Sequence, residues 1–422
     1  MHFLHIIQRY YPYTGGSELY FQEFSEQLAA DGHQVTVLTT NAWDLDHFWA
    51  AGRKTVDEAE ARHNGVRIKR FPVERSPGPP IVYPILRRLM VELGRLPGTT
   101  PLLRRMALLT PRVPQLQRYL ATTGEHFDLV HTTNITLDFT ILPALRFAQQ
   151  RGIPHLCTPF VHLGEPGKRQ IVRYYTQPHQ IEILRRSQRV MVQTTLEGDE
   201  LRQLGVPDEQ LRLIGCWVRP ETLEGGSAER FRREHNLHGP IVLSIGAAAY
   251  DKGTMHTIEA MQRLWQSGSD ATLVLIAGTT LAQFEQFYAT LPESTRQRIL
   301  LIRAAPHQTK LDALAAADVY VMPSRTDSFG IVYLEAWIYD VPVIGARAGG
   351  VPAVIDHGHD GLLVEFGDVA ALADEIQRLL SDRDLARRLG QAGHAKVLRQ
   401  LLFEQQYAKI RAVYQEVTGR EL

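Results

Sequence analysis

The stretch VYVMPSRTDSFGIVYLEA, residues 319–336, decides the fold class of this chain. It opens with four apolar residues, which predict a short buried strand. A polar loop that begins at Pro323 follows, and beyond Gly330 an apolar-rich segment predicts a helix. A buried strand that passes through a short loop into a helix is half of a β–α–β unit, from which helix-covered parallel sheets are built.

The same pattern recurs along the chain in two series, with a boundary between residues 214 and 240. In the first series, short apolar runs predict strands at 3–7, 35–38, 129–131, 155–158 and 190–193. In the second, strands are predicted at 241–246, 272–278, 299–302, 319–322 and 341–344, alternating with helices at 254–266, 281–291, 308–316 and 330–339. The prediction is an α/β chain of two Rossmann-like parallel-sheet domains, 1–215 and 216–400. A final helix at 401–422 is expected to return to the first domain.

Composition limits the class of protein. The chain has 422 residues, 44% of them apolar and 22% charged, which is typical of a soluble globular protein. Basic and acidic residues both number 46, so no overall charge favours nucleic acid, and none is expected as a partner. Two cysteines are too few for a disulfide framework or a zinc cluster. Residues 3–7 lack the basic flank of a signal peptide and no apolar run has membrane-spanning length, so a cytoplasmic protein is expected.

Residues 75–120 differ from the rest of the chain. They hold eight arginines against one acidic residue, Glu92, and prolines divide them into short helices rich in leucine and isoleucine. One interpretation is a helical insertion with solvated arginines. The other is a surface that docks on anionic lipid at the inner face of the membrane, or that receives a phosphorylated or lipid-linked acceptor, with Arg87 and Arg88 on the acceptor side. The sequence leaves both interpretations open.

Two loops of the second series carry candidate binding residues. Asp327 lies just before a predicted helix and Glu335 one to two turns inside it, so the two carboxylates are placed to reach opposite ends of one ligand. The helix start offers free N–H groups to an anion between them. Lys252 follows the predicted strand 241–246 and precedes a helix, an arrangement that can bind phosphate, although the segment is neither a P-loop nor a G-x-G-x-x-G motif. The alternative from spacing alone is an N-cap aspartate and an unrelated helix glutamate.

Glycines in the first β–α loop form a third candidate patch. Gly15 and Gly16 follow the first predicted strand and precede the first predicted helix. Glycines at this position let the backbone approach a ligand closely, and they serve equally well in a tight turn.

Together these motifs resemble the family-4 glycosyltransferases, which have the GT-B fold, and the resemblance spans nearly the whole chain. In the first half it rests on Tyr11-Pro12, Gly15-Gly16-Ser17-Glu18, Gly32-His33-Gln34-Val35-Thr36-Val37 and Asp128-Leu129-Val130-His131. In the second half it rests on Lys252-Gly253, Ala317-Asp318-Val319-Tyr320-Val321-Met322-Pro323-Ser324, Phe329-Gly330, Glu335-Ala336, Pro342-Val343-Ile344-Gly345, Gly349-Gly350-Val351-Pro352 and Asp360-Gly361-Leu362-Leu363-Val364. The resemblance implies two domains that face each other across a cleft.

The resemblance also implies an activity and residue roles. The activity is that of a retaining, metal-independent hexosyltransferase that moves a sugar from a nucleotide diphosphate donor to a glycan, lipid-linked or small-molecule acceptor, with no cofactor and no metal-binding residue. The implied catalytic residues are His162, Asp327 and Lys252. The implied donor-binding residues are Gly15, Gly16, Lys252, Asp327, Phe329, Gly330, Ile331 and Glu335. His131, at a predicted strand end, is the weaker candidate on the acceptor side.

Four positions depart from the family pattern. Asp327 replaces the first glutamate of E-x7-E, and Ser328 and Asp340 replace glycines. Ala247 stands where the family has an arginine that binds the diphosphate, and losing such a cation costs about 2–4 kcal/mol unless another group replaces it. Candidate replacements are Arg325, Arg219 and Arg347. These departures keep two alternatives open, an inactive GT-B binding or scaffold protein and a GT-B glycosyl phosphorylase.

Overall fold

The computed structural model describes residues 1–13, 15–75 and 78–422. Contacts within the chain divide it into two compact units. Unit 1 comprises residues 1–161, 170–214 and 407–422, and unit 2 comprises residues 162–169 and 215–406. Compared with the boundaries expected from the sequence, the short segment 162–169 groups with the second unit, and the final helix changes unit at residue 407.

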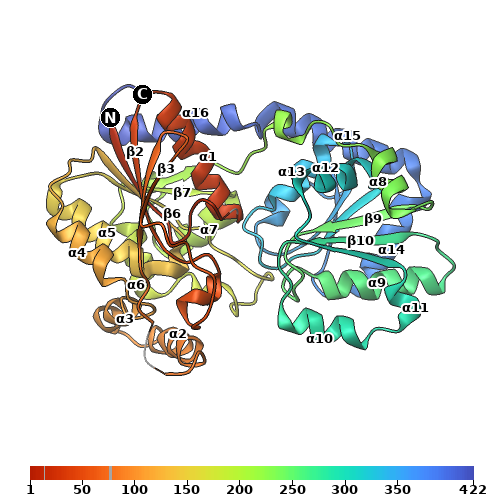
Figure 1. Cartoon of the computed structure of the whole chain (residues 1–422), viewed down its shortest axis with the longest axis horizontal. Helices are drawn as coiled ribbons and strands as arrows, with labels where there is room; N and C mark the ends of the chain where they lie inside the picture. Colours follow the sequence, from red (N-terminus) through yellow and green to blue (C-terminus); the bar gives the residue numbers. More distant parts are fainter. Residues whose placement is uncertain (14, 76–77) are drawn as a thin grey trace. The chain divides into compact units, whose positions relative to one another are not determined.

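Unit 1 contains a mostly parallel sheet covered by helices (Figure 1). Its strands are β1 (His2–Ile6), β2 (Gln34–Thr40), β3 (Glu60–His63), β4 (Val66–Phe71), β5 (Leu129–Thr133), β6 (His155–Thr158), β7 (Arg189–Val192) and β8 (Leu211–Leu213). Their order within the described residues is β3-β4-β2-β1-β5-β6-β7-β8, and only the β3–β4 pair is antiparallel. The order reverses between β1 and β5, so the loop that holds Gly15 leaves the sheet at its switch point.

Seven helices of unit 1 follow its strands or form the basic segment, and one returns from the end of the chain. They are α1 (Gly16–Ala30), α2 (Val82–Leu93), α3 (Thr100–Ala107), α4 (Pro114–Thr122), α5 (Asp138–Arg151), α6 (Pro178–Arg185), α7 (Thr195–Gln203) and α16 (Phe403–Thr418). The segment 75–120 is helical as expected, with α2, α3 and α4, although its residues 76–77 lie outside the described residues.

Helix α16 is attached to the sheet of unit 1 through buried polar contacts. The Tyr414 hydroxyl lies 3.0 Å from Nε2 of His5 on β1 and 2.7 Å from Nδ1 of His131 on β5. All three side chains are fully buried. Because a buried polar atom without a partner costs free energy, these hydrogen bonds specify where the helix packs.

Unit 2 is a parallel sheet with helices on its faces (Figure 1). Its strands are β9 (Ile241–Ile245), β10 (Thr272–Ala277), β11 (Ile299–Arg303), β12 (Val319–Met322), β13 (Val343–Ala346) and β14 (Leu362–Val364). Its helices are α8 (Ala228–His235), α9 (Thr254–Gln266), α10 (Ala282–Thr290), α11 (Glu293–Arg296), α12 (His307–Ala316), α13 (Ile331–Ile338), α14 (Val369–Ser381) and α15 (Arg383–Gln400). The strand order within the described residues is β11-β10-β9-β12-β13-β14.

The strands of unit 2 are apolar on both faces because helices cover both. Every residue of β9, β12, β13 and β14 is buried. One large apolar cluster joins strand residues such as Leu273 and Val321 with Ile258 of α9 and Ile376 of α14. Continuous apolar runs of this kind are typical of parallel sheets, which explains why the sequence located these strands. Across the described part of the chain, none of the helices combines the length and the apolar character needed to span a membrane.

Candidate functional site

The candidate site of unit 2 lies where the strand order reverses. Strands β9 and β12 are neighbours, with Val319 opposite Val242 and Tyr320 opposite Leu243. The chain continues outward from β9 to β10 on one side and from β12 to β13 on the other. The loops that leave the carboxyl ends of β9 and β12 therefore flank the switch point, where open α/β sheets bind ligands.

Close packing holds these two loops together. Gly253, in the β9 loop, has φ +74°, and a Cβ atom there would lie 2.4 Å from the carbonyl oxygen of Pro323 in the β12 loop. The Tyr320 hydroxyl donates to the carbonyl oxygen of Ile245 at 3.1 Å, which ties the ends of the two strands together. The lysine that precedes Gly253 is thus held against the loop that carries Asp327.

Lys252 and Asp327 form an ion pair in which Nζ lies 2.7 Å from Oδ1. The other carboxylate oxygen, Oδ2 of Asp327, is buried and has no hydrogen-bond partner among the described residues. Burial alone would raise the pKa of Asp327, but the charge and hydrogen bond of Lys252 outweigh it and hold the pKa below its usual value. Asp327 is therefore ionised at neutral pH, with one oxygen held by Lys252 and the other buried without a partner among the described residues.

Glu335, on α13, repeats this arrangement. Its Oε1 lies 2.6 Å from Nζ of Lys310 on α12, and its Oε2 is buried without a partner in the part of the chain that the structure describes. Sequence reasoning did not single out Lys310. It lies 25 residues before Glu335 on a different helix, and only the packing of the fold brings the two together.

Helix α13 begins directly beyond the Asp327 loop. Gly330, with φ +90°, is its N-cap, and Ile331 is its first residue. Phe329, immediately before, is 5% exposed, so its side chain is buried. The first N–H groups of an α-helix have no acceptor within the helix, so this start offers donors and a positive dipole end to an anion.

The segment 162–169 joins the site through two glycines that follow β13. The N–H of Gly349 donates to the carbonyl oxygen of Gly164, and the N–H of Gly350 donates to that of Asp327, both at 2.8 Å. Gly349 has φ +61°, and a Cβ atom there would lie 2.3 Å from the carbonyl oxygen of Asp327. This approach explains why glycine is needed at this position.

His162 lies at the start of that segment and responds to the charges of this site. Burial and, to a smaller extent, the positive charge of Lys252 lower the pKa of His162 to about 4, although Asp327 and Asp251 oppose the shift. The imidazole is therefore neutral at pH 7. A neutral ring can donate one hydrogen bond and accept another, as contact with a sugar hydroxyl requires.

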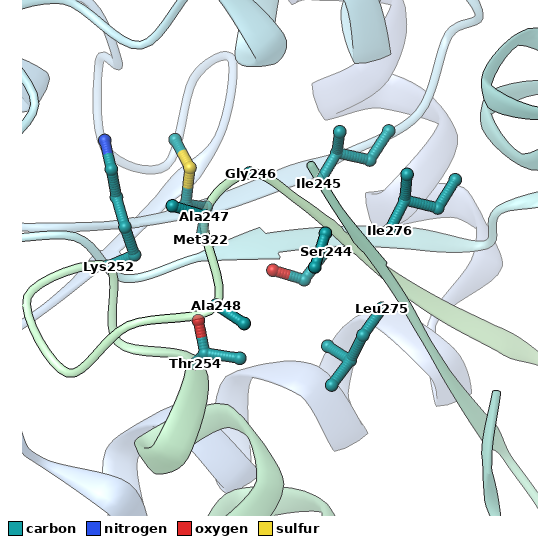
Figure 2. Close-up of a pocket in the computed structure, with 11 residues that line it drawn as sticks. Ser244, Ile245, Gly246, Ala247, Ala248, Lys252, Thr254, Leu275, Ile276 and Met322 are labelled. Carbon is teal, nitrogen blue, oxygen red and sulfur yellow. The ribbon is translucent and has the colours of Figure 1, made fainter. Parts of the chain in front are cut away.

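Ala247 lines a small pocket beside Lys252 (Figure 2). The pocket is lined by Ser244, Ile245, Gly246, Ala247, Ala248, Lys252, Thr254, Leu275, Ile276, Ala277 and Met322. Ala247 and Met322 both line the pocket, and Lys252 follows on the same loop as Ala247 (Figure 2). Apart from Ser244, Lys252 and Thr254, the side chains that line the pocket are apolar.

The three arginines considered as replacements for the missing cation each have a partner within unit 2. Arg325 binds Asp251 at 2.7 Å, next to Lys252 in the chain. Arg219 stacks 3.3 Å from the ring centroid of Phe403, and Arg347 lies 3.8 Å from a carboxylate oxygen of Glu365. Of the three, Arg325 is tied most directly to the Lys252 loop.

Several predicted residues lie in unit 1. Gly15 and Gly16 stand at the start of α1, and their contact with a donor stays a prediction. The acceptor role predicted for His131 needs correction: the residue is fully buried, and its two ring nitrogens lie 2.7 Å from Tyr414 Oη and 2.8 Å from Thr158 Oγ1. No ring nitrogen is left for an acceptor.

Arg87 and Arg88, both predicted on the acceptor side, differ in their exposure to solvent. Arg87 is buried and binds Asp138, so its predicted acceptor contact is also corrected to a structural role. Arg88 is exposed on α2. This difference could not be predicted from the sequence, because the two residues are adjacent and identical in type.

Comparison with solved structures identifies the architecture. Sucrose-phosphate synthase from Thermosynechococcus elongatus matches over 99% of both chains with a TM-score of 0.74 at 22% identity. HepE from Anabaena, solved in complex with UDP and glucose, matches over 99% of this chain and 100% of its own with a TM-score of 0.72 at 16% identity. At these identities the likeness shows the fold, which is GT-B as expected from the sequence.

Family comparison agrees with this architecture. Residues 15–217 match the glycosyl transferase 4-like domain, and residues 227–396 match the family described as glycosyl transferases group 1. The chain belongs to the family-4 glycosyltransferases of the GT-B fold.

Curated relatives match more locally. N-acetyl-alpha-D-glucosaminyl L-malate synthase from Bacillus anthracis is 27% identical over 222 residues, which are 52% of this chain and 57% of that protein. GDP-mannose-dependent monoacylated alpha-(1-6)-phosphatidylinositol monomannoside mannosyltransferase from Corynebacterium glutamicum is 31% identical over 185 residues, 42% of this chain and 48% of that protein. The matches thus span about half the length of these relatives.

Proposed function

We propose that this chain is a retaining hexosyltransferase that takes its sugar from a nucleotide diphosphate donor and works without a metal ion. The observation that carries the proposal is the pair of carboxylates at the switch point of unit 2. Asp327 and Glu335 each keep one oxygen on a lysine and leave the other buried and unpartnered within the described residues. Two such acceptors, with a helix start between them, suit a ligand that has hydroxyls at both ends and anionic groups in the middle.

The donor is assigned to these groups by their chemistry. The free oxygen of Glu335 accepts a hydrogen bond from the ribose, and that of Asp327 accepts one from the transferred sugar. The diphosphate lies at the N-terminus of α13, where the N–H groups near Phe329, Gly330 and Ile331 and the amine of Lys252 meet its charge. Asp327 is one methylene shorter than the glutamate usual in the family, so its sugar hydroxyl must come closer to the loop.

Departure of the nucleoside diphosphate is the step these residues assist. The bond between the anomeric carbon and the phosphate oxygen breaks, and positive character develops on the sugar while negative charge develops on the diphosphate. Lys252 and the α13 dipole stabilise that negative charge. The acceptor oxygen then bonds to the anomeric carbon from the face the diphosphate leaves, and its proton passes to a phosphate oxygen. Configuration is retained, and neutral His162 contacts a hydroxyl of the sugar.

The acceptor belongs to one of three chemical classes: a glycan, a lipid-linked sugar or a small molecule. Relatives include enzymes named for malate, for a phosphatidylinositol mannoside and for inositol 3-phosphate, so the family resemblance alone selects none of these classes. The proposal therefore assigns residues to the donor and names only the chemical classes of the acceptor.

A donor-binding screen tests this function. Thermal shift and titration calorimetry with UDP-, GDP- and ADP-sugars, each with and without EDTA, should identify one nucleotide that raises the melting temperature independently of EDTA. Product from that donor should keep its anomeric configuration by NMR. Binding to none of the nucleotide sugars would favour a scaffold protein, and phosphate-dependent breakdown of a glycoside would favour a phosphorylase. Loss of binding in EDTA would contradict metal independence.

A further inference from the structure

Helices α2 and α3 expose an unusual amount of apolar surface. Within the described residues, six of the eleven exposed large apolar side chains lie between residues 81 and 109. They are Ile81 (58% exposed), Ile85 (57%), Leu89 (45%), Leu96 (56%), Leu102 (47%) and Leu109 (50%). Scattered exposed leucines are ordinary in soluble proteins, but a concentration of this kind marks an interaction surface.

The exposed residues of α2 form one stripe. Ile81, Ile85 and Leu89 are spaced by four residues, so they share a face of the helix, whereas Met90 and Val91 on the opposite side are buried. Met90 packs with Leu103 of α3 in a small core cluster. The helix is thus apolar on both faces, and only the inner one is covered by the described residues.

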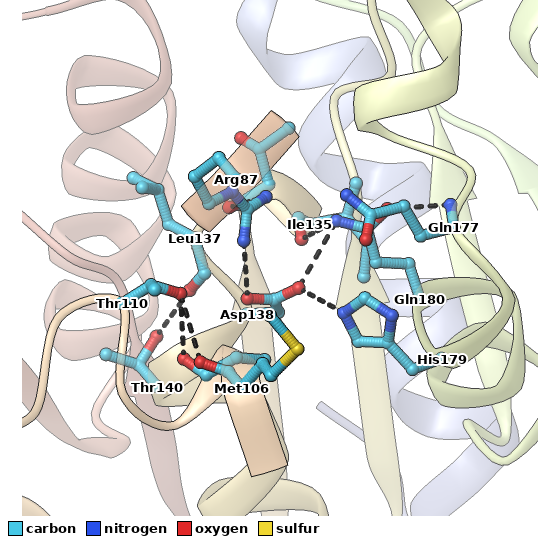
Figure 3. A network of polar contacts seen from close by, with 12 residues as sticks. Arg87, Met106, Thr110, Ile135, Leu137, Asp138, Thr140, Gln177, His179 and Gln180 are labelled. Carbon is cyan, nitrogen blue, oxygen red and sulfur yellow. Dashed lines mark hydrogen bonds and ion pairs between the residues drawn. The ribbon is translucent and has the colours of Figure 1, made fainter. Parts of the chain in front are cut away.

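A buried ion pair holds α2 against the rest of unit 1 (Figure 3), and a partly exposed one links α3 to α6. Arg87 of α2 donates to Asp138 at 3.3 Å and to the carbonyl oxygen of Thr136 at 2.8 Å, and Asp138 also binds His179 at 2.8 Å. On α3, Arg104 pairs with Glu182 at 3.2 Å. Because a buried charge must keep its partner, α2 cannot turn its outer face inward. The stripe is a fixed feature of the surface.

Arginines outnumber acidic residues in this segment. Arg88 and Arg105 are exposed, and Arg95 is exposed but paired with Glu92. The one acidic residue of the segment, Glu92, lies 2.5 Å from Arg95 and 3.7 Å from Arg173, so its charge is neutralised. An apolar stripe edged by arginines complements a surface that has an anionic layer over a hydrocarbon interior.

We propose that the outer face of α2 and α3, from Ile81 to Leu109, is a docking surface for an anionic lipid bilayer. The arginines meet the phosphate layer, and the isoleucine and leucine side chains enter the acyl region below it. A protein groove would satisfy the apolar stripe as well, but the excess of arginine over acid matches a phosphate surface. The inference does not depend on the proposed transfer reaction, because docking needs no donor.

Vesicle co-sedimentation of the full chain tests the apolar stripe. The wild type should pellet with vesicles of equimolar phosphatidylcholine and phosphatidylglycerol, and much less with phosphatidylcholine alone or at high salt. Ile81→Ser/Ile85→Ser/Leu89→Ser should abolish pelleting while its melting temperature stays near that of the wild type, since these side chains are exposed. The matched control, Leu281→Ser/Leu398→Ser, replaces exposed leucines of unit 2 (50% and 47% exposed) and should pellet like the wild type.

The arginines are tested by a second pair of variants. Arg88→Gln/Arg105→Gln should weaken binding to the mixed vesicles by about fivefold for each arginine and should make it less sensitive to salt. Arg383→Gln/Arg388→Gln, which removes two exposed arginines of α15, is the matched control and should change neither property.

Three results would overturn the proposal. The first is a wild type that stays in the supernatant with the mixed vesicles. The second is equal pelleting of the triple serine variant and the wild type. The third is a stable dimer in analytical ultracentrifugation that the triple serine variant dissociates, because the stripe would then be the interface with a second copy of this chain.

Discussion

Asp327 and Glu335, eight residues apart on one loop and helix, are held in the same way by lysines from two other segments. Lys252 occupies Oδ1 of the first and Lys310 occupies Oε1 of the second, at 2.7 and 2.6 Å. The remaining oxygen of each is buried without a partner in the described part of the chain. Since buried polar atoms are nearly always hydrogen-bonded, these two acceptors are the atoms to which the proposed function assigns the hydroxyl groups of the donor.

Lys252→Ala should remove most of the activity. The variant loses the cation beside the proposed leaving group, and it leaves the buried Asp327 carboxylate without its partner. We expect kcat/KM to fall by about 30- to 1000-fold, which corresponds to about 2–4 kcal/mol of lost transition-state stabilisation. Steady-state kinetics with the donor found in the binding screen measures this. Arg388→Ala, on the exposed face of α15, should retain full activity, and a fully active Lys252→Ala would contradict the assignment.

Glu335→Ala should remove recognition of the ribose. The wild type should bind a nucleoside diphosphate more tightly than its 2′,3′-dideoxy analogue, because the carboxylate accepts from a ribose hydroxyl. Glu335→Ala should bind both compounds equally, at an affinity lower by about 1.5–3 kcal/mol, the usual contribution of a hydrogen bond to a charged group. Calorimetry of both proteins with both compounds gives the coupling free energy between Glu335 and the ribose hydroxyls. Equal discrimination in both proteins would place the ribose elsewhere.

Lys310→Met should weaken the preference for ribose over dideoxyribose, although Lys310 itself is not assigned a contact with the ligand. Lys310 holds one oxygen of Glu335, and methionine keeps the length of the side chain without its charge. The unpaired Glu335 then becomes costly to bury, so we expect a lower melting temperature and a smaller preference for ribose over dideoxyribose. If the melting temperature alone changed, Lys310 would have a purely structural role.

Ala247→Arg should strengthen donor binding. The variant restores a cation beside Lys252, at the pocket that Ala247 lines. A charged hydrogen bond to a phosphate contributes about 1.5–3 kcal/mol, so the Kd for UDP or GDP should fall by about tenfold or more. Ala247→Met adds similar bulk without charge and should not tighten binding. If both variants weakened binding alike, the pocket would be too crowded for a side chain, and another group would serve the diphosphate.

The regular part of the fold could be predicted because its signals are local. Strands 155–158 and 319–322 and helix 254–266 have the bounds expected from the sequence, since apolar runs and helical spacing depend on neighbouring residues. Asp340, expected at a position that favours glycine, indeed has φ +57°. By contrast, strands β3 and β4 were missed although Val66 and Ile68 alternate with charged residues, a usable period-two signal.

The candidate site was only partly predictable because side-chain partners come from distant segments. The loops of Lys252 and Asp327 follow predicted strands, so their place at one edge of the sheet could be inferred. The pairing of Lys310 with Glu335 depends on how α12 packs near α13. The burial of His131 depends on Tyr414, 283 residues further along the chain. No local sequence pattern predicts either of these contacts.

Unit 1 should lose stability as the pH falls below 6.5. Burial lowers the pKa of His5 and His155 to about 3, and that of His131 well below its usual value, so the fold keeps all three neutral. In the unfolded chain a histidine takes up a proton near pH 6.5. Above that pH these three neutral side chains do not reduce the free energy of unfolding. As the pH falls from 6.5 towards the folded pKa values, the free energy of unfolding decreases. At pH 5.5 each of these histidines should lower the free energy of unfolding by about 1.4 kcal/mol relative to its value at high pH.

One buried carboxyl opposes this effect. Burial raises the pKa of Glu197 to about 7, so the folded state favours its protonated form, and acidification from pH 7.5 to 5.5 is favourable at this residue. Because three histidines act against one glutamate, urea unfolding should still give a lower free energy of unfolding at pH 5.5 than at pH 7.5. A stability that rose on acidification would mean that the histidines are exposed or already protonated in the fold.

Tyr414→Phe should destabilise unit 1 far more than the loss of one hydroxyl suggests. The Tyr414 hydroxyl donates to one buried histidine ring and accepts from the other, His5 at 3.0 Å and His131 at 2.7 Å. Phenylalanine keeps the packing but leaves both rings short of a partner, at about 1–3 kcal/mol each, so urea unfolding should show a loss of about 2–6 kcal/mol. Tyr407→Phe on the same helix is the matched control, because its hydroxyl donates at 2.6 Å to Asp31, an exposed residue that water can satisfy. Equal losses in the two variants would mean that the buried histidines do not depend on α16.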